Sequence, residues 1–149
     1  MVQRAEDPEV YAPEDRELRS ILGEARTVAV VGLSSSPERY SYEVAGYLQS
    51  KGYRIIPVNP NETEVLGEKA YPSLLDVPER IDAVNVFRRA DETPEVARQA
   101  VKVGAKVLWL QNDIVNDEAR RIAEEGGLEV IMGLCIMSTH RRLAQSKGV

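Results

Sequence analysis

Five short apolar runs rich in valine, isoleucine and leucine recur along the chain, and segments with helical periodicity lie between them. Continuous apolar runs of this length are typical of parallel strands buried on both faces. The predicted strands are residues 27–32, 54–58, 83–87, 106–110 and 128–132. Such alternation predicts an α/β protein with a Rossmann-like, doubly wound, mostly parallel five-stranded sheet and flanking helices.

The segments between these runs predict the helices and the domain organisation. The predicted helices are residues 14–25, 41–51, 93–103, 117–125 and, as a short last helix, 138–145. The connection 61–80 is punctuated by Gly67, Pro72 and Pro78, with a short strand or helix expected near 73–76. Because 149 residues fit one domain, we expect an N-terminal arm at 1–13 and a single domain at 14–149.

Composition excludes several classes of protein. No apolar run approaches the length that spans a bilayer, and the first residues lack an apolar signal core, so we expect a cytoplasmic protein without membrane contact. One cysteine, Cys135, and one histidine, His140, argue against a disulfide and a zinc site, and no metal is expected. A net charge of −5 disfavours a nucleic-acid partner. Nothing in the sequence defines a protein partner or a homo-oligomer interface.

The first predicted strand ends at a glycine followed by small hydroxyl residues, Gly32-Leu33-Ser34-Ser35-Ser36. A helix follows, and the N–H groups of the turn and of the first helical turn are expected to be unpaired, which favours an anion there. Arg39 can add a charge-assisted contact. Serines also gather in loops as caps and turn formers, so the loop alone leaves both interpretations open.

Three further loops are expected at the same carboxyl edge of the sheet, where doubly wound proteins bind ligands. Asn59, Pro60 and Asn61 follow the second strand without the acid that holds the ribose of NAD, and Glu62 comes too late to replace it. Turn formation alone also explains Asn59 and Pro60. The sequence therefore disfavours a nicotinamide cofactor.

Two arginines and two amide side chains are also expected at this carboxyl edge of the sheet. Arg88 and Arg89 directly follow the third strand, and guanidinium groups bind phosphate in a bidentate manner. An ion pair with Asp91 or Glu92 explains the two arginines equally well. After the fourth strand, Gln111 and Asn112 offer amide donors and acceptors, or cap the next helix.

The sequence contains no motif that assigns a catalytic residue. The phosphate-binding loop of triphosphatases and the nucleophile elbow of hydrolases are both absent. Cys135 is interpreted as a buried small hydrophobe and His140 as a structural or solvated residue. No catalytic residue is predicted.

In its order of motifs the chain resembles the small, stand-alone CoA-binding proteins, which are similar to the CoA-binding domain of the succinyl-CoA synthetase α subunit and of ADP-forming acyl-CoA synthetases. The matching segments are Val28 to Pro37, Gly52 to Pro60, Val65 to Leu74, Asp82 to Arg89, Gly104 to Gln111 and Asn116 to Ala119. The resemblance covers about residues 14–143.

This resemblance implies coenzyme A (CoA) bound at the carboxyl edge, with its pyrophosphate at Gly32–Ser35 and its nucleotide near Asn59–Asn61. Relatives often carry Asp-Arg-Cys where this chain has Gly133-Leu134-Cys135, so no role of that arginine is transferred. The domain that carries the phosphorylated histidine of the synthetases has no counterpart here. We therefore expect binding of CoA or an acyl-CoA without catalysis. An NAD(H)-binding sensor module and a small enzyme acting on a CoA thioester are the alternatives.

Overall fold

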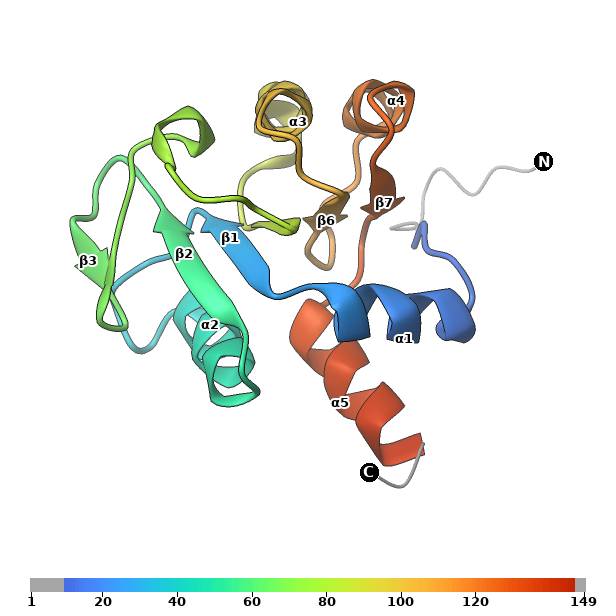
Figure 1. Cartoon of the computed structure of the whole chain (residues 1–149), viewed down its shortest axis with the longest axis horizontal. Coiled ribbons are helices and arrows are strands. Elements are labelled where there is room, and N and C mark those ends of the chain that lie inside the picture. The colour runs from blue at the N-terminus through green and yellow to red at the C-terminus, as the bar shows by residue number, and fades with distance from the viewer. Residues whose placement is uncertain (1–9, 147–149) are drawn as a thin grey trace.

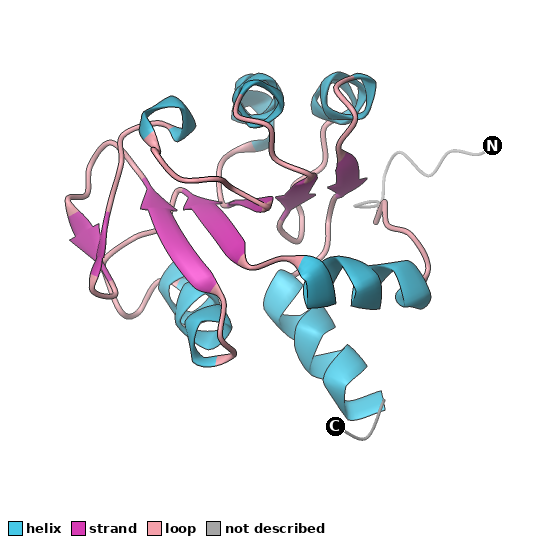
Figure 2. Ribbon diagram, viewed as in Figure 1, coloured by secondary structure: helices cyan, strands magenta, loops and turns pink. Residues whose placement is uncertain are grey.

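The computed structural model describes residues 10–146, in which a five-stranded sheet lies between two layers of helix (Figures 1 and 2). The strands are β1 (Thr27–Val31), β2 (Arg54–Val58), β5 (Ala83–Val86), β6 (Val107–Leu110) and β7 (Glu129–Ile131). Their spatial order is β2-β1-β5-β6-β7, and every neighbouring pair is parallel. The order changes direction at β1, so the predicted Rossmann-like, doubly wound fold is confirmed.

Two groups of helices cover opposite faces of this sheet (Figure 1). One face carries α1 (Asp15–Glu24), α2 (Tyr40–Ser50) and α5 (Ile136–Ser146). The other carries α3 (Thr93–Lys102), α4 (Asp117–Glu125) and the 3-10 turn η1 (Leu74–Asp76), while a second such turn, η2 (Ala90–Glu92), precedes α3. Within residues 10–146, no helix has the length and apolar character needed to cross a bilayer.

The core follows from the alternation of side chains along each strand. In β1, Val28 and Val30 join the apolar cluster under α1, α2 and α5, whereas Ala29 and Val31 join the cluster under α3 and α4. The side chains on both faces of β1 are buried, which explains why its sequence is a continuous apolar run. Trp109 of β6 is fully buried, and its indole N–H donates to the Leu134 carbonyl over 2.8 Å.

The structure differs from the sequence prediction at two places. The last helix begins at Ile136 instead of residue 138, because the Cys135 carbonyl already accepts the first helical hydrogen bond, from the Thr139 N–H at 3.0 Å. A two-stranded hairpin of β3 (Glu64–Val65) and β4 (Glu68–Lys69) was not predicted. The helix or strand expected near 73–76 is η1.

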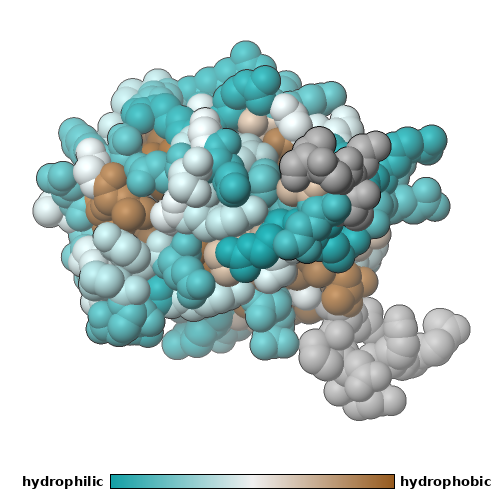
Figure 3. Space-filling model, turned by 90° about the horizontal axis from the view of Figure 1, so that it is seen from below, coloured by the Kyte–Doolittle hydropathy of each residue, from teal (hydrophilic) through white to brown (hydrophobic). Residues whose placement is uncertain are grey.

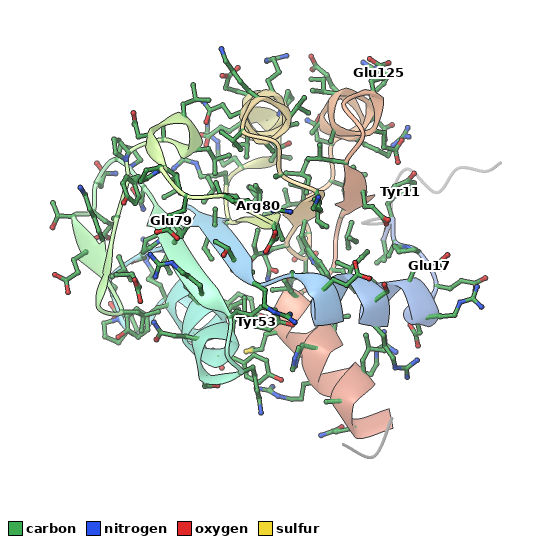
Figure 4. The ribbon with its side chains drawn as sticks, viewed as in Figure 1. Tyr11, Glu17, Tyr53, Glu79, Arg80 and Glu125 are labelled. Atoms are coloured by element: carbon green, nitrogen blue, oxygen red, sulfur yellow. The ribbon has the colours of Figure 1, made fainter. Side chains whose placement is uncertain are left out.

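Each outer strand of the sheet meets one residue from a loop. Tyr11 and Met132 exchange two backbone hydrogen bonds of 3.0 and 2.9 Å beyond β7, and Figure 4 shows Tyr11 on this side of the molecule. At the opposite edge, Tyr71 forms a parallel bridge with Val58 of β2. Residues 1–9 of the predicted arm lie outside the described part, and the boundary at residue 13 stays a prediction.

The molecular surface on the side of α2 and α5 is mostly hydrophilic, and its apolar side chains lie in separate areas (Figure 3). Large contiguous apolar patches mark protein interfaces. The separate apolar areas of this face do not form such a patch.

Candidate functional site

The candidate site is built around Gly32, where the chain leaves β1. Gly32 has a φ of +91°, and its N–H donates to the Val58 carbonyl over 2.8 Å. A Cβ at this position would lie 2.5 Å from the Phe87 carbonyl oxygen. Only glycine fits both the left-handed conformation and the close approach, and so the loops after β1, β2 and β5 converge here.

The N–H groups of the following loop were predicted to be unpaired, and that prediction is wrong. The Ser34 N–H donates to Ser41 Oγ over 3.1 Å, and the Ser36 N–H donates to Ser34 Oγ over 3.0 Å. The Ser35 N–H donates to a carboxylate oxygen of Glu62 over 3.0 Å. The corner has the N–H donors expected of an anion site, but the three N–H groups of Ser34, Ser35 and Ser36 already donate to oxygen atoms of the chain itself.

A cavity of about 360 to 460 Å³ lies on each side of this corner. The larger, which we call the corner cavity, brings together five residues predicted from the sequence with four that were not. Its lining residues are Gly32, Ser34, Arg39, Asn59 and Asn61, together with Tyr40, Ser41, Glu62 and Phe87. Among residues 10–146, the exposed guanidinium of Arg39 forms no ion pair. It therefore places a guanidinium without a direct ion pair at the start of α2.

The smaller cavity, which we call the α3 cavity, lies between the same loops and α3. Pro60 and Arg88 line it, but Arg88 Nε is already 2.7 Å from Glu92 Oε1. Arg89 lines neither cavity and forms ion pairs of 3.3 Å with both Asp91 and Glu92. Of the two interpretations of Arg88 and Arg89, phosphate binding or an ion pair with Asp91 or Glu92, the structure shows the ion pairs.

Besides Arg89, four predicted residues line neither cavity: Leu33, Ser35, Gln111 and Asn112. Leu33 is buried in the core, and only its carbonyl faces the loops, where it accepts from Asn59 Nδ2 over 3.0 Å. Gln111 is 2% exposed, so the prediction that its side chain lines the site is wrong. Its Oε1 instead accepts from the Ile136 N–H over 3.0 Å and thereby fixes the start of α5. Asn112 is exposed and lines neither cavity.

Sequence reasoning missed two aromatic residues and misjudged one acid. Tyr40 and Phe87 meet edge to face in the wall of the corner cavity, with ring centroids 6.3 Å apart. The available signal was their position, one at the start of a helix and one after a strand. Glu62 was expected to come too late after β2, yet its carboxylate lies in the same cavity.

Cys135 lies behind the wall of the corner cavity, in a polar setting. Its Sγ is 2.7 Å from the hydroxyl of Tyr40, a residue that lines the cavity and is 42% exposed. Burial raises the pKa of the Cys135 thiol, but hydrogen bonds from the Tyr40 hydroxyl and the Ser138 amide lead the effects that outweigh it and set the pKa below the ordinary value. Burial, together with the contact to Cys135, raises the pKa of Tyr40 to about 12. Cys135 is buried as predicted, although its neighbours favour the thiolate.

His140 lies elsewhere, between two tyrosines. Its Nδ1 is 2.8 Å from the Tyr47 hydroxyl, and its ring meets Tyr53 edge to face at 5.9 Å. Figure 4 shows Tyr53 between the α2–β2 region and α1. Burial, with a smaller contribution from Lys51, lowers the pKa of His140. His140 lines a separate cavity that shares no residue with the corner cavity, which agrees with the structural role expected for it.

The strand order defines a Rossmann-like α/β protein, and the corner cavity lies at the carboxyl edge beside β1, where proteins of this fold commonly bind ligands. The match to a family model is more specific. The chain belongs to the CoA binding domain family, whose model matches residues 26–141, and this confirms the resemblance deduced from the motifs.

Relatives of this family occur alone and within larger enzymes. Uncharacterized protein YneT of Bacillus subtilis is 45% identical over 128 residues, which cover 86% of this chain and 95% of that protein. Acetate–CoA ligase (ADP-forming) II of Archaeoglobus fulgidus is 31% identical over 101 residues, which cover 66% of this chain but 15% of the ligase. A hypothetical protein from Pyrococcus horikoshii has a solved structure with a TM-score of 0.87 and 42% identity, covering 91% of this chain and 97% of its own.

Proposed function

We propose that the protein binds CoA or an acyl-CoA at the carboxyl edge of β1, β2 and β5. The observation that carries this proposal is the Arg39 guanidinium at the start of α2, which has no ion-pair partner among residues 10–146 and lines the corner cavity of a chain of the CoA binding domain family. CoA brings a pyrophosphate and a 3′-phosphate, and both suit a helix start with a guanidinium. No side chain is proposed as catalytic.

The two cavities favour an extended ligand. They are lined by consecutive residues of the same loops, such as Asn59 and Pro60 after β2, or Phe87 and Arg88 after β5. A ligand that crosses the edge beside Gly32 would therefore contact both cavities. In this proposal the pyrophosphate lies at Gly32–Ser35 and Arg39, the nucleotide meets Asn59–Asn61, and Arg88 faces the 3′-phosphate.

Calorimetric titration of the purified protein with CoA, dephospho-CoA, NAD and ADP tests this proposal. We expect CoA to bind more tightly than NAD or ADP, because it alone supplies both the pyrophosphate and the 3′-phosphate along an extended ligand. Absence of heat with CoA, while NAD binds, would overturn the proposal. Loss of affinity for CoA but not for dephospho-CoA in Arg88→Ala would support the position of the 3′-phosphate.

Binding of NAD(H) is the first alternative, and Glu62 favours it. In NAD-binding domains an acid after the second strand accepts the ribose hydroxyls. Glu62 lines the corner cavity from the loop after β2, although it is bonded to the Ser35 N–H. Tighter binding of NAD than of CoA would select this alternative.

An enzyme acting on a CoA thioester is the second alternative, and Cys135 favours it. The sulfur contacts Tyr40, a residue of the corner cavity, and its surroundings lower the pKa of the thiol. Turnover of an acyl-CoA that is abolished in Cys135→Ala would select this alternative.

A further inference from the structure

The geometry points to Glu62 as a carboxylate that occupies the place of a ligand phosphate and thereby weakens the binding of anions at the corner. This inference rests on the proposed function and deepens it, because it names the residue that limits the affinity for anions at the same site.

Glu62 reaches the corner from a different part of the chain. Glu62 lies 27 positions after Ser35 in the sequence, in the loop between β2 and the β3–β4 hairpin. One carboxylate oxygen accepts the Ser35 N–H at 3.0 Å, a distance that also suits a phosphate oxygen. The carboxylate therefore takes the same N–H group that the loop after β1 would offer to an anionic ligand.

The backbone beneath Glu62 is held in place. Asn59 Oδ1 accepts the Asn61 N–H over 2.9 Å, and the Asn59 carbonyl accepts the Glu62 N–H over 3.2 Å. A turn fixed in this way keeps Glu62 in the lining of the corner cavity. The carboxylate can then leave Ser35 by rotation of its own side chain, without rearrangement of the loop.

Two charged side chains of the corner cavity, Arg39 and Glu62, act in opposite directions on the affinity for an anionic ligand. Arg39 lines the same cavity but forms no ion pair with Glu62, so its positive charge stays available to a ligand. A phosphate that approaches Ser35 meets the negative charge of Glu62 and has to displace it. A small anion has only the corner to offset this repulsion, whereas an extended ligand adds contacts in the α3 cavity. Glu62 therefore lowers the affinity of the corner for both kinds of anion.

Calorimetric titrations with CoA and with inorganic pyrophosphate test this inference in the wild type, Glu62→Gln and Glu64→Gln. Glutamine retains an oxygen that accepts the Ser35 N–H, so the first substitution removes the charge alone. Glu64 is the matched control, because it is an exposed acid two residues away that does not line the corner cavity. We expect Glu62→Gln to bind both ligands about 5- to 10-fold more tightly, as follows from one charge contact near the surface. Glu64→Gln stays within about twofold of the wild type.

The outcomes separate this inference from the proposed function. Equal affinities in all three proteins overturn the inference and leave the proposed function standing. Weaker binding of CoA by Glu62→Gln also overturns it, because the carboxylate then accepts a hydrogen bond from the ligand. No heat from any of the three proteins overturns the proposed function, and the inference with it.

A measurement without ligand tests the internal hydrogen bond directly. In the free protein we expect the Ser35 amide to exchange its hydrogen faster in Glu62→Ala than in the wild type, because the amide loses its acceptor. Glu64→Ala leaves this exchange rate unchanged. Equal exchange of Ser35 in wild type and Glu62→Ala overturns the inference, whatever the affinities.

Discussion

The two ends of the parallel sheet each hold a carboxylate that accepts backbone N–H groups, but under different conditions. At the amino edge, Asp82 accepts from Arg26 at 2.8 Å and from Thr27 at 3.0 Å, and its side chain is only 19% exposed. At the carboxyl edge, Glu62 accepts one N–H, from Ser35, beside an open cavity. A carboxylate that accepts backbone N–H groups is thus part of the packed structure at the amino edge. At the carboxyl edge, the same kind of hydrogen bond lies where a ligand could replace the carboxylate.

The arginines show the same contrast. Arg54, the first residue of β2, forms ion pairs with Glu79 and Glu68, and these hydrogen bonds raise its pKa. Arg39 at the opposite edge has no such partner among residues 10–146. Arg54 at the amino edge is therefore paired within the chain, whereas Arg39 at the carboxyl edge has no ion-pair partner among the described residues.

The largest expected effect comes from adding a methyl group at the corner. Gly32→Ala places a Cβ 2.5 Å from the Phe87 carbonyl oxygen at a φ of +91°. We expect it to lower the free energy of unfolding by about 2–4 kcal/mol, from backbone strain and steric overlap. Urea denaturation measures this loss.

Gly23→Ala is the matched control. Gly23 lies within α1, and a Cβ there meets nothing within 4 Å. We expect it to raise the free energy of unfolding by about 0.5–1 kcal/mol, because alanine is the better helix former. Equal stability of the two variants would contradict the close approach of the loops at Gly32.

Asp82→Asn tests whether the amino-edge carboxylate is structural. Hydrogen bonds to a charged acceptor are stronger than those to a neutral one, so we expect a loss of about 1–2 kcal/mol at pH 7. Burial raises the pKa of Asp82, but the Arg26 and Thr27 amides, with Arg80 and Lys106, outweigh it and lower the pKa below its usual range. Urea denaturation at several pH values measures the loss.

The pH dependence of this loss has a definite sign. Because the pKa of Asp82 is lower in the folded than in the unfolded state, its contribution is complete well above pH about 4. The contribution disappears as the pH falls through the folded pKa, so wild type and Asp82→Asn converge in acid. Asp76→Asn, at an exposed acid of η1, is the control that leaves stability unchanged. A loss that stays constant down to acid pH would refute the role of the charge.

Arg39→Gln and Arg89→Gln compare an unpaired with a paired arginine at the carboxyl edge. We expect Arg39→Gln to weaken CoA binding about 10-fold, because a charge-assisted contact to phosphate is lost. Arg89 is exposed and already bonded to Asp91 and Glu92, so its replacement changes the affinity by less than about twofold. Calorimetry measures both, and the reverse order of effects would assign the phosphate contact to Arg89.

The smallest expected effect concerns Cys135, behind the corner cavity. Tyr40→Phe removes the hydroxyl 2.7 Å from the sulfur but keeps the ring. The pKa of the thiol then rises, because the thiolate loses a hydrogen-bond donor. We therefore expect the pH midpoint of iodoacetamide alkylation to move upward. Mass spectrometry measures the extent of alkylation at each pH, and the modified residue is unambiguous because the chain has one cysteine.

Tyr42→Phe is the control for this measurement. Tyr42 also lies in α2 and packs against the apolar core rather than against the sulfur. We expect its alkylation profile to match the wild type. A downward shift in Tyr40→Phe would show that the hydroxyl acts as an acceptor and not as a donor.

The strands and the corner could be predicted because apolar periodicity and glycine are local signals. All five strands occur within one or two residues of the predicted bounds. The β3–β4 hairpin escaped prediction because Leu66 adopts a φ of 55° before Gly67 at 80°, a turn usually marked by Asn-Gly or Asp-Gly. Leucine at that position gives no turn signal.

The side chains of the site were predicted less well, because their direction depends on distant parts of the chain. Gln111 follows β6 as expected, but the start of α5 and Asn85 draw its amide oxygen into the core. Glu62 is four residues beyond β2, and the turn at Asn59 brings it back to the corner. Neither effect is encoded in the spacing of these residues alone.

The bridges at Tyr11 and Tyr71 bear on how far the outer strands of the sheet are open to pairing with another chain. An outer strand of a sheet exposes N–H and C=O groups that can pair with another chain, the first step toward aggregation. Here a residue from a loop bonds to the chain at each outer strand, and Pro57 in β2 has no N–H to offer. A truncation that removes Tyr11 would uncover one of these edges and create a template for the assembly of β-rich oligomers.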